Sequence, residues 1–425
     1  MKINKISKLK GTIIVPTDKS ITHRAIMLSS IASGKSYINN YLSSDDCFMT
    51  VNAFKSMGVN VEDKGTSLII EGVGINGLKK PSTDIYAGNS GTTTRLLSGI
   101  LSGQNFMSVI TGDESLSKRP MKRIIEPLSL MGADIKAQGN NFLPLSINAT
   151  GNLKSINYKS PVASAQIKSC ILLAGLYADG ITTVTEPIKS RDHSERMLKA
   201  FGADVCVDGL SVSIKQCDRL YCQSIDVPCD ISSAAFFIVA GLIVPNSNIK
   251  ILNVNINPTR DGILEVLKQM GADITLSNVR TMSGEEVADI EVKTSKLNSI
   301  NIGSSIMPRL IDEVPIIALA ATQAYGKTVI SGAKELKVKE SNRLLAISSQ
   351  LKQMGADIVQ TEDGLIIEGG KKLNGCIVDS FKDHRIAMML SIAGLVAEGT
   401  TEILNSNCVN ISFSNFYEVL KQLCR

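Results

Sequence analysis

One phrase that recurs along the chain constrains the fold more than any other feature. An apolar helical segment ending in a Met-Gly-Ala-Asp-Ile type of turn occurs at 54–61, 128–135, 198–205, 267–274 and 351–358, and residues 418–425 begin like a sixth copy. Glycine after such a segment is a common helix stop, because it adopts left-handed backbone angles without strain. The copies lie about 70 residues apart, which indicates six similar units, each too large for a solenoid repeat.

A second phrase alternates with the first. Apolar helical segments such as 386–396 end at a Gly or Asn turn and are followed by runs of alternating strand residues. These helices are apolar nearly all round, which predicts that they lie buried inside the protein with sheets wrapped around them. A chain of 425 residues favours two to three domains, and six units suit two domains of three. The predicted fold class is α/β.

Composition and charge exclude several classes of function. The net charge of +5 is too small for a nucleic-acid coat, but it is compatible with anionic small molecules. The nine cysteines include no C-x-x-C pair, which favours reduced thiols in the cytoplasm and no metal site. The N-terminus lacks the apolar region of a signal peptide, and the most apolar segment, 231–244, is too short to span a bilayer. We therefore expect a cytoplasmic protein that binds neither nucleic acid nor membrane.

Cationic residues gather where helices are predicted to begin, at 16–24, 88–95, 337–343 and 383–385. A helix N-terminus carries about half a positive charge, so cations there are electrostatically unfavourable unless an anion binds. Phosphate and carboxylate ligands engage both the backbone N–H groups and the cations. The 88–91 loop lacks the Gly-Lys-Ser/Thr sequence of a nucleotide P-loop, so ATP binding is not indicated.

Each cluster also has a structural interpretation. Lys339, Glu340 and Arg343 could form an exposed, ion-paired helix face. The 88–91 loop could be a capped helix entry, His384 a structural histidine and Arg119 an exposed loop arginine. The occurrence of four such clusters in one chain favours the functional interpretation.

Nine blocks of the sequence resemble the EPSP synthase (3-phosphoshikimate 1-carboxyvinyltransferase) family, in the family's order and along the whole chain. They are VPTDKSITHRA (15–25), GNSGTTTRLL (88–97), RPM (119–121), ASAQIKSCILLAG (163–175), EPIKSRDHSERML (186–198), PTRDGIL (258–264), IDEVP (311–315), VKESNRL (338–344) and DHRIAMML (383–390). The resemblance implies a two-domain inside-out α/β barrel, each domain made of three βαβαββ repeats with buried helices and outer sheets. Residues 1–18 and 229–425 would form one domain and residues 19–228 the other, with the active site in the cleft between them.

The resemblance also implies an activity. Members transfer the enolpyruvyl group of phosphoenolpyruvate to the 5-hydroxyl of shikimate 3-phosphate and release phosphate, by addition and elimination without a covalent enzyme intermediate. The reaction belongs to the shikimate pathway, which leads to chorismate and the aromatic amino acids, and the family is the target of glyphosate. No metal or organic cofactor is required, and we expect a monomer.

The family's motifs assign roles to particular residues. Asp312 would take the hydroxyl proton, Glu340 would protonate the methylene carbon, and Lys19 is a third catalytic candidate. The residues expected to bind phosphoenolpyruvate are Lys19, Gly91, Arg119, Gln166, Arg343 and Arg385. The residues expected to bind shikimate 3-phosphate are Lys19, Ser20, Arg24, Ser164, Gln166, Arg191, Asp312 and Lys339.

Some features depart from one branch of the family, and two rival functions stay open. That branch has Ser where Ala165 stands and Lys where Ile411 aligns, which leaves the contribution of the last loop unsettled; other members share Ala165 and Arg191.

A related enolpyruvyl transferase acts on UDP-N-acetylglucosamine, but it carries a reactive Cys in a loop where residues 113–118 have none. A non-enzymatic polyanion scaffold would avoid acidic groups such as Asp312 and Glu340 among its cations.

Overall fold

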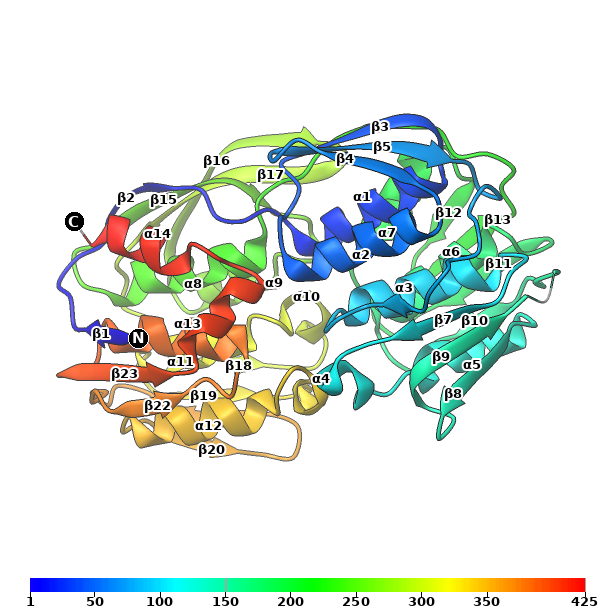
Figure 1. Cartoon of the computed structure of the whole chain (residues 1–425). Coiled ribbons are helices and arrows are strands. Elements are labelled where there is room, and N and C mark those ends of the chain that lie inside the picture. The colour runs from blue at the N-terminus through cyan, green and yellow to red at the C-terminus, as the bar shows by residue number, and fades with distance from the viewer. Residues whose placement is uncertain (150, 425) are drawn as a thin grey trace. The chain divides into compact units, whose positions relative to one another are not determined.

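The computed structural model describes residues 1–149 and 151–424, which form two compact units (Figure 1). Unit 1 comprises Met1–Pro16, Pro228–Thr281 and Glu285–Arg425, and unit 2 comprises Thr17–Val227 with Met282–Gly284. The expected boundaries, after Asp18 and after Pro228, lie two residues and one residue beyond the observed ones.

The described residues of unit 2 form three four-stranded sheets with one strand order. In each sheet the first strand runs parallel to the second, and the second pairs antiparallel with the third in the order. The sheets are β14(Ser224–Asp226)-β3(Ser33–Asn39)-β5(Ser67–Val73)-β4(Asn60–Asp63), β6(Ile85–Tyr86)-β7(Ser108–Thr111)-β9(Phe142–Asn148)-β8(Asp134–Gln138) and β10(Asn157–Lys159)-β11(Ile181–Thr185)-β13(Ser211–Lys215)-β12(Val205–Asp208).

Unit 1 repeats this order in two of its sheets and shortens it in the third. The two four-stranded sheets are β2(Lys10–Ile13)-β15(Asn248–Asn255)-β17(Glu285–Lys293)-β16(Asp273–Met282) and β18(Asn301–Ile302)-β19(Lys327–Ile330)-β21(Leu365–Glu368)-β20(Asp357–Gln360). The third has three strands, β22(Ile377–Asp379)-β23(Thr400–Leu404)-β1(Lys2–Asn4), of which β1 comes from the N-terminal segment. Each sheet thus corresponds to one of the six predicted repeats.

The most apolar helices lie inside the sheets, as their composition predicted (Figure 1). Every residue of α11 (Val314–Thr322) is buried, as are all of α8 (Ile231–Ile243) except its last residue. The other inner helices are α1 (Lys19–Ile31), α3 (Gly91–Ser102), α6 (Ala165–Gly175) and α13 (His384–Gly394). Each unit has its own hydrophobic core, built on these helices. The inside-out α/β arrangement is confirmed.

The longer of the remaining helices are only partly buried. In unit 2 the remaining helices are α2 (Asp45–Ser56), the short α4 (Glu114–Ser117), α5 (Lys122–Leu130) and α7 (His193–Ala200). In unit 1 they are α9 (Gly262–Gln269), the short α10 (Met307–Leu310), α12 (Arg343–Gln353) and α14 (Phe416–Leu423), with two 3-10 helices, η1 (Lys334–Val338) and η2 (Ser406–Ile411). Ile411 ends η2 and is half-buried.

The recurring Met-Gly turn ends a helix in every full copy. The residue before the glycine is the helix C-cap and is buried, and the glycine itself has a φ between +90° and +96° at Gly58, Gly132, Gly202, Gly271 and Gly355. A side chain would be strained in that left-handed conformation, so only glycine turns the chain there without cost. The buried Met or Phe pins the turn to the core, and a sheet strand follows.

In each unit, one parallel first strand of a four-stranded sheet is separated in the sequence from the rest of its repeat. In unit 1, β2 pairs in parallel with β15, although the chain enters unit 2 between them. In unit 2, β14 pairs in parallel with β3, although the chain has passed through the rest of that unit in between. The first strand of one repeat in each unit is therefore supplied from a distant part of the sequence.

Candidate active site

The three inner helices of unit 2 begin at residues expected to bind ligand. Helix α1 begins at Lys19, α3 at Gly91, and α6 directly after Ser164. The residue before each helix caps it through a side-chain oxygen, and the caps are Asp18, Ser90 and Ser164. The helix residues that are not fully buried all lie in or next to the first turn of each helix, and the rest of each helix is buried. The ends that remain accessible are therefore the ones that carry the predicted site.

Arg95 and Gln166 join the beginnings of α3 and α6. Arg95 Nη1 donates to Gln166 Oε1 at 2.8 Å, and Gln166 Nε2 donates to Thr92 Oγ1 at 3.2 Å. Gly91 lies next to the guanidinium groups of both Arg95 and Arg119. A Cβ atom built on Gly91 would be 3.0 Å from Arg95 Nη1 and 3.7 Å from Arg119 Nη1. The Gly91 loop, two arginines and Gln166 thus form one polar cluster.

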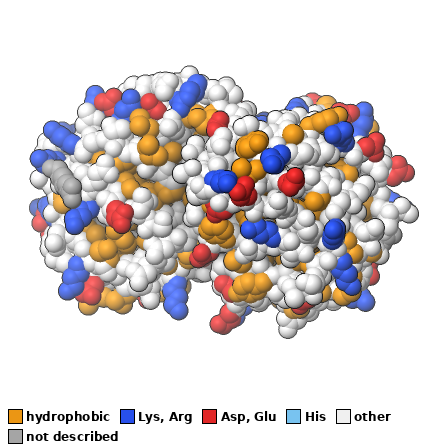
Figure 2. Space-filling model, turned by 45° about the horizontal axis from the view of Figure 1, so that its top comes forward, with side chains coloured by type: hydrophobic (Ala, Val, Ile, Leu, Met, Phe, Trp, Pro, Cys, Tyr) orange, Lys and Arg blue, Asp and Glu red, His pale blue; other side chains and the backbone are white. Residues whose placement is uncertain are grey.

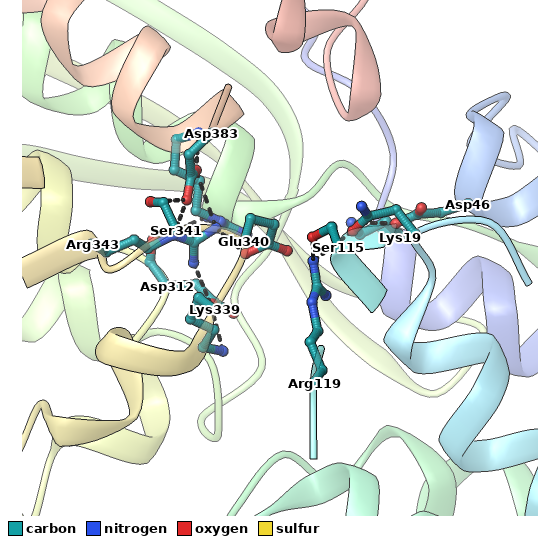
Figure 3. Close-up of polar contacts among 12 residues, drawn as sticks. Lys19, Asp46, Ser115, Arg119, Asp312, Lys339, Glu340, Ser341, Arg343 and Asp383 are labelled. Carbon is teal, nitrogen blue, oxygen red and sulfur yellow. Dashed lines mark hydrogen bonds and ion pairs between the residues drawn. The ribbon is translucent and has the colours of Figure 1, made fainter. Parts of the chain in front are cut away.

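Arg119 is half-buried and held by the same loop. Its Nη2 donates to Asn89 Oδ1, and at 3.4 Å to Ser115 Oγ (Figure 3). Asn89 in turn donates to Asp113 Oδ2 at 2.7 Å. The interpretation of Arg119 as an exposed loop arginine is therefore wrong, because these partners fix it beside Gly91.

Lys19 points toward Asp46, the second residue of α2 (Figure 3). Its Nζ lies 2.9 Å from Asp46 Oδ2, and both side chains are partly exposed, at 23% and 13%. Thr93 Oγ1 donates to the backbone oxygen of Asp46 at 3.5 Å, which links this pair to α3. The beginnings of α1, α3 and α6 are consequently connected by side-chain contacts within unit 2.

Arg24 is buried one turn further along α1. Its Nη1 donates to the Ser20 backbone oxygen at 3.0 Å, its Nε to Ser194 Oγ at 2.7 Å and its Nη2 to Ser169 Oγ at 2.8 Å. Ser20 and Arg24 therefore share a face, as their spacing predicted. Arg191 lies half-buried in the loop between β11 and α7 and belongs to the same unit.

Arg343 is the centre of the predicted residues in unit 1, where its side chain is only 1% exposed. Its Nε donates to Asp383 Oδ2 at 2.8 Å, its Nη2 to Glu340 Oε2 at 2.6 Å, and its Nη1 lies 3.4 Å from Asp312 Oδ1 (Figure 3). Burial alone would lower the pKa of Arg343, but Asp383 and Glu340 raise it above the usual value. Burial would likewise raise the pKa of Asp383, but Arg343 holds it below its usual range.

Lys339 and Arg385 complete this cluster from two further segments. Lys339 Nζ donates to Asp312 Oδ1 at 3.2 Å, and Arg385 Nη1 donates to the Asp312 backbone oxygen at 3.1 Å. Asp383 caps α13 by accepting from the Arg385 backbone N–H at 2.9 Å. The structure therefore brings together all five residues predicted in unit 1: Asp312, Lys339, Glu340, Arg343 and Arg385.

The interpretation of Lys339, Glu340 and Arg343 as an exposed, ion-paired helix face is wrong. Lys339 and Glu340 do not lie in a helix, because η1 ends at Val338 and α12 begins at Arg343. The Arg343 guanidinium is not exposed either, since it is buried among three carboxylates. By contrast, the 88–91 loop is indeed a serine-capped helix entry, in addition to its contacts with the arginines.

The contact residues that were not among the predicted site residues include three charged ones: Asp46, Arg95 and Asp383. Arg95 lies four residues after Gly91, a spacing that places the two on one helix face and could have identified it. Asp383 precedes the predicted Arg385, and its type is a favoured helix cap. Nothing local pointed to Asp46, because Lys19 is 27 residues away in the sequence.

Other features of the described residues bear on ligand classes. No group of three or more His, Cys, Asp and Glu side chains among residues 1–149 and 151–424 is arranged to hold a metal ion. No helix in that part of the chain has the length and apolar content needed to cross a membrane. On the face shown in Figure 2, basic and acidic side chains are interspersed over the surface. All nine cysteines are free thiols.

Comparison with known proteins agrees with this arrangement. A family model described as EPSP synthase (3-phosphoshikimate 1-carboxyvinyltransferase) matches residues 3–420. A protein of that name from Endomicrobium trichonymphae is 58% identical over the full length of both chains, and one from Geobacillus kaustophilus is 53% identical over 98% of each. A solved structure of EPSP synthase from Acinetobacter baumannii has a TM-score of 0.89 and 48% identity, covering 99% of this chain and 97% of its own. The chain therefore belongs to the EPSP synthase (3-phosphoshikimate 1-carboxyvinyltransferase) family.

Proposed function

We propose that this chain transfers the enolpyruvyl group of phosphoenolpyruvate to the 5-hydroxyl of shikimate 3-phosphate and releases phosphate. The observation that carries the proposal is full-length identity of 50–58% to relatives named 3-phosphoshikimate 1-carboxyvinyltransferase. Both substrates are multiply charged anions, and the site residues supply cations and helix N-termini that suit them. The scaffold and UDP-N-acetylglucosamine alternatives lose support, since the relatives' name specifies the other reaction.

We propose the following assignment of residues to the substrates, as the family's motifs imply it. Phosphoenolpyruvate binds to Lys19, Gly91, Arg119, Gln166, Arg343 and Arg385. Shikimate 3-phosphate binds to Lys19, Ser20, Arg24, Ser164, Gln166, Arg191, Asp312 and Lys339. Contacts within each unit support the assignment. In unit 1 they join Lys339, Arg343 and Arg385 to Asp312, and in unit 2 they join Arg24 to Ser20.

In this proposal Asp312 acts as the base that takes the hydroxyl proton. Lys339 and Arg343 both approach Asp312 Oδ1, at 3.2 and 3.4 Å. Two cations at one oxygen favour the ionised carboxylate, which is the form a base needs. The backbone oxygen of the same residue accepts from Arg385, so the carboxylate is held at a fixed place in the cluster.

Glu340 acts as the acid that protonates the methylene carbon. Without substrate it is paired with Arg343 at 2.6 Å, which favours its ionised form. A phosphoenolpyruvate carboxylate that binds Arg343 must compete with Glu340 for the same guanidinium. Displacement of Glu340 from Arg343 removes the cation that favours its ionised form, and the released carboxyl group can then deliver a proton taken from solvent.

Phosphate release provides the test of the proposed function. The purified chain should release phosphate from phosphoenolpyruvate only when shikimate 3-phosphate is present, and should form 5-enolpyruvylshikimate 3-phosphate in equal amount. Release without shikimate 3-phosphate, or with UDP-N-acetylglucosamine in its place, contradicts the proposal. That the chain is a cytoplasmic monomer is part of the proposal, and sedimentation of the active enzyme checks the monomeric state.

A further inference from the structure

A buried ion cluster in unit 2 lies outside the residues assigned above. Lys168, the fourth residue of α6, donates to Glu186 Oε2 at 2.7 Å and lies 2.8 Å from Glu195 Oε1. The three side chains are 1%, 2% and 4% exposed. Burial alone would lower the pKa of Lys168, but Glu195 and Glu186 raise it above its usual value. Buried charges persist only when they are paired in this way.

Glu186 does more than neutralise Lys168. Its Oε1 accepts from the Ser164 backbone N–H at 3.2 Å and from Ser190 Oγ at 2.6 Å. Its Oε2 accepts from the Ser190 backbone N–H at 3.2 Å, in addition to Lys168. The bonds to Ser190 close the short loop that begins at Glu186, and Arg191 follows directly. One carboxylate therefore holds both the cap of α6 and the loop that presents Arg191.

Glu195 occupies a different position around the same lysine. It belongs to the first turn of α7, and its Oε2 has no hydrogen-bond partner among the described residues. It contacts neither the Ser164 amide nor Ser190 in the way Glu186 does. The two glutamates thus share the charge of Lys168, but of the two it is Glu186 that also bonds the Ser164 amide and Ser190. Lys168 Nζ itself donates to the Ser190 backbone oxygen at 3.4 Å.

We infer that Glu186 is a positioning residue for shikimate 3-phosphate, which holds Ser164 and Arg191 in the geometry that binds the phosphorylated substrate. The inference rests on the proposed function, because Ser164 and Arg191 are assigned to that substrate there. It assigns Glu186 no contact with the reacting atoms.

A Glu186→Gln substitution separates this role from simple charge pairing. With the amide oxygen toward Lys168 and the Ser190 amide, the NH2 group faces Ser164 and the Ser190 hydroxyl. The hydroxyl can rotate to accept, but the Ser164 N–H cannot. The backbone N–H of Ser164, the capping residue of α6, then loses its acceptor, whereas Lys168 keeps a polar partner. We expect the KM for shikimate 3-phosphate to rise about tenfold or more, as for the loss of one hydrogen bond to a charged group.

The experiment compares Glu186→Gln with the matched control Glu195→Gln in the full chain. Each variant removes one of the two negative charges that neutralise Lys168, so both variants should have a lower melting temperature than wild type. Only Glu186→Gln should raise the KM and the calorimetric Kd for shikimate 3-phosphate, with the KM for phosphoenolpyruvate within about twofold of wild type and kcat changed less than the KM. Equal rises in both variants, or an unchanged Kd in Glu186→Gln, overturn the inference.

A milder variant keeps the inference testable if Glu186→Gln does not fold. Ser190→Ala removes one donor to Glu186 and leaves its charge paired with Lys168, and it should raise the KM for shikimate 3-phosphate by a smaller factor. An unchanged KM in Ser190→Ala then counts against the inference. A wild-type chain that does not bind shikimate 3-phosphate at all contradicts the proposed function instead, so the two failures are distinguishable.

Discussion

Substitution of Lys19 by Met should separate catalysis from stability. Lys19 contributes to folding through its ion pair with Asp46, at 2.9 Å, between side chains that are 23% and 13% exposed. A partly exposed pair of this kind contributes at most about 1 kcal/mol, so the melting temperature should fall by only about 2–4 °C. If Lys19 stabilises charge that develops on phosphoenolpyruvate in the transition state, its loss should lower kcat by about 100-fold or more.

The assay is the initial rate of phosphate release at saturating concentrations of both substrates, measured together with thermal unfolding of the same samples. Asp46→Asn is the matched control, because it removes the same ion pair and keeps the cation. We expect a similar melting temperature for both variants but a severe loss of turnover in Lys19→Met alone. A folded Lys19→Met protein with turnover within about threefold of wild type would refute the reasoning, as would equal losses in the two variants.

Three further substitutions test other contacts. Gly91→Ala should raise the inhibition constant of glyphosate more than the KM for phosphoenolpyruvate, because the new Cβ lies 3.0 Å from Arg95 Nη1 and narrows the space for the longer inhibitor; equal rises in inhibition assays would contradict this. Arg343→Met leaves the fully buried Asp383 without its cation, so urea unfolding should show a loss of about 3–5 kcal/mol, and a loss below 1 kcal/mol would contradict the burial argument. Burial lowers the pKa of His23 to about 3, so the unfolded chain binds a proton below pH 6.5 that the folded chain does not. Wild type should therefore lose about 1.6 kcal/mol more stability than His23→Gln between pH 6.5 and pH 5. Equal changes in the free energy of unfolding of the two proteins over this pH range, measured by urea unfolding, would disprove it.

Much of the fold could be predicted from the sequence because its signals are local. The glycine of each Met-Gly turn adopts a left-handed φ, as its position after a helix indicated. Segments apolar all round, such as that of α11, became buried inner helices. The pairing of β2 with β15 could not be derived from the residues, because β2 has four residues and its partner lies more than 200 positions away.

The residues of the candidate site also include some that the sequence predicted and some that it did not. Cationic residues at helix beginnings were visible as a pattern, and the structure places them there at Lys19 and Arg343. Their partners were not visible, because an ion pair between distant segments leaves no periodic trace. Lys168 is the exception, because the sequence shows a lysine inside an apolar helix, and a buried lysine requires an acidic partner. Which acid it finds is decided by tertiary packing alone.

The interrupted repeat of unit 1 has a consequence for how the chain can fold. Residues Thr17–Val227 stand between β2 and its partner β15, and closing an unfolded loop of about 210 residues costs about 5 kcal/mol of chain entropy. Pro16 and Asp230, at the two ends of this insertion, are joined by a backbone hydrogen bond of 2.9 Å. Once the inserted unit has folded, its two exits lie close together and most of that entropy has already been lost. Unit 2 should therefore acquire its structure first, and the sheet that contains β2 should be among the last to form.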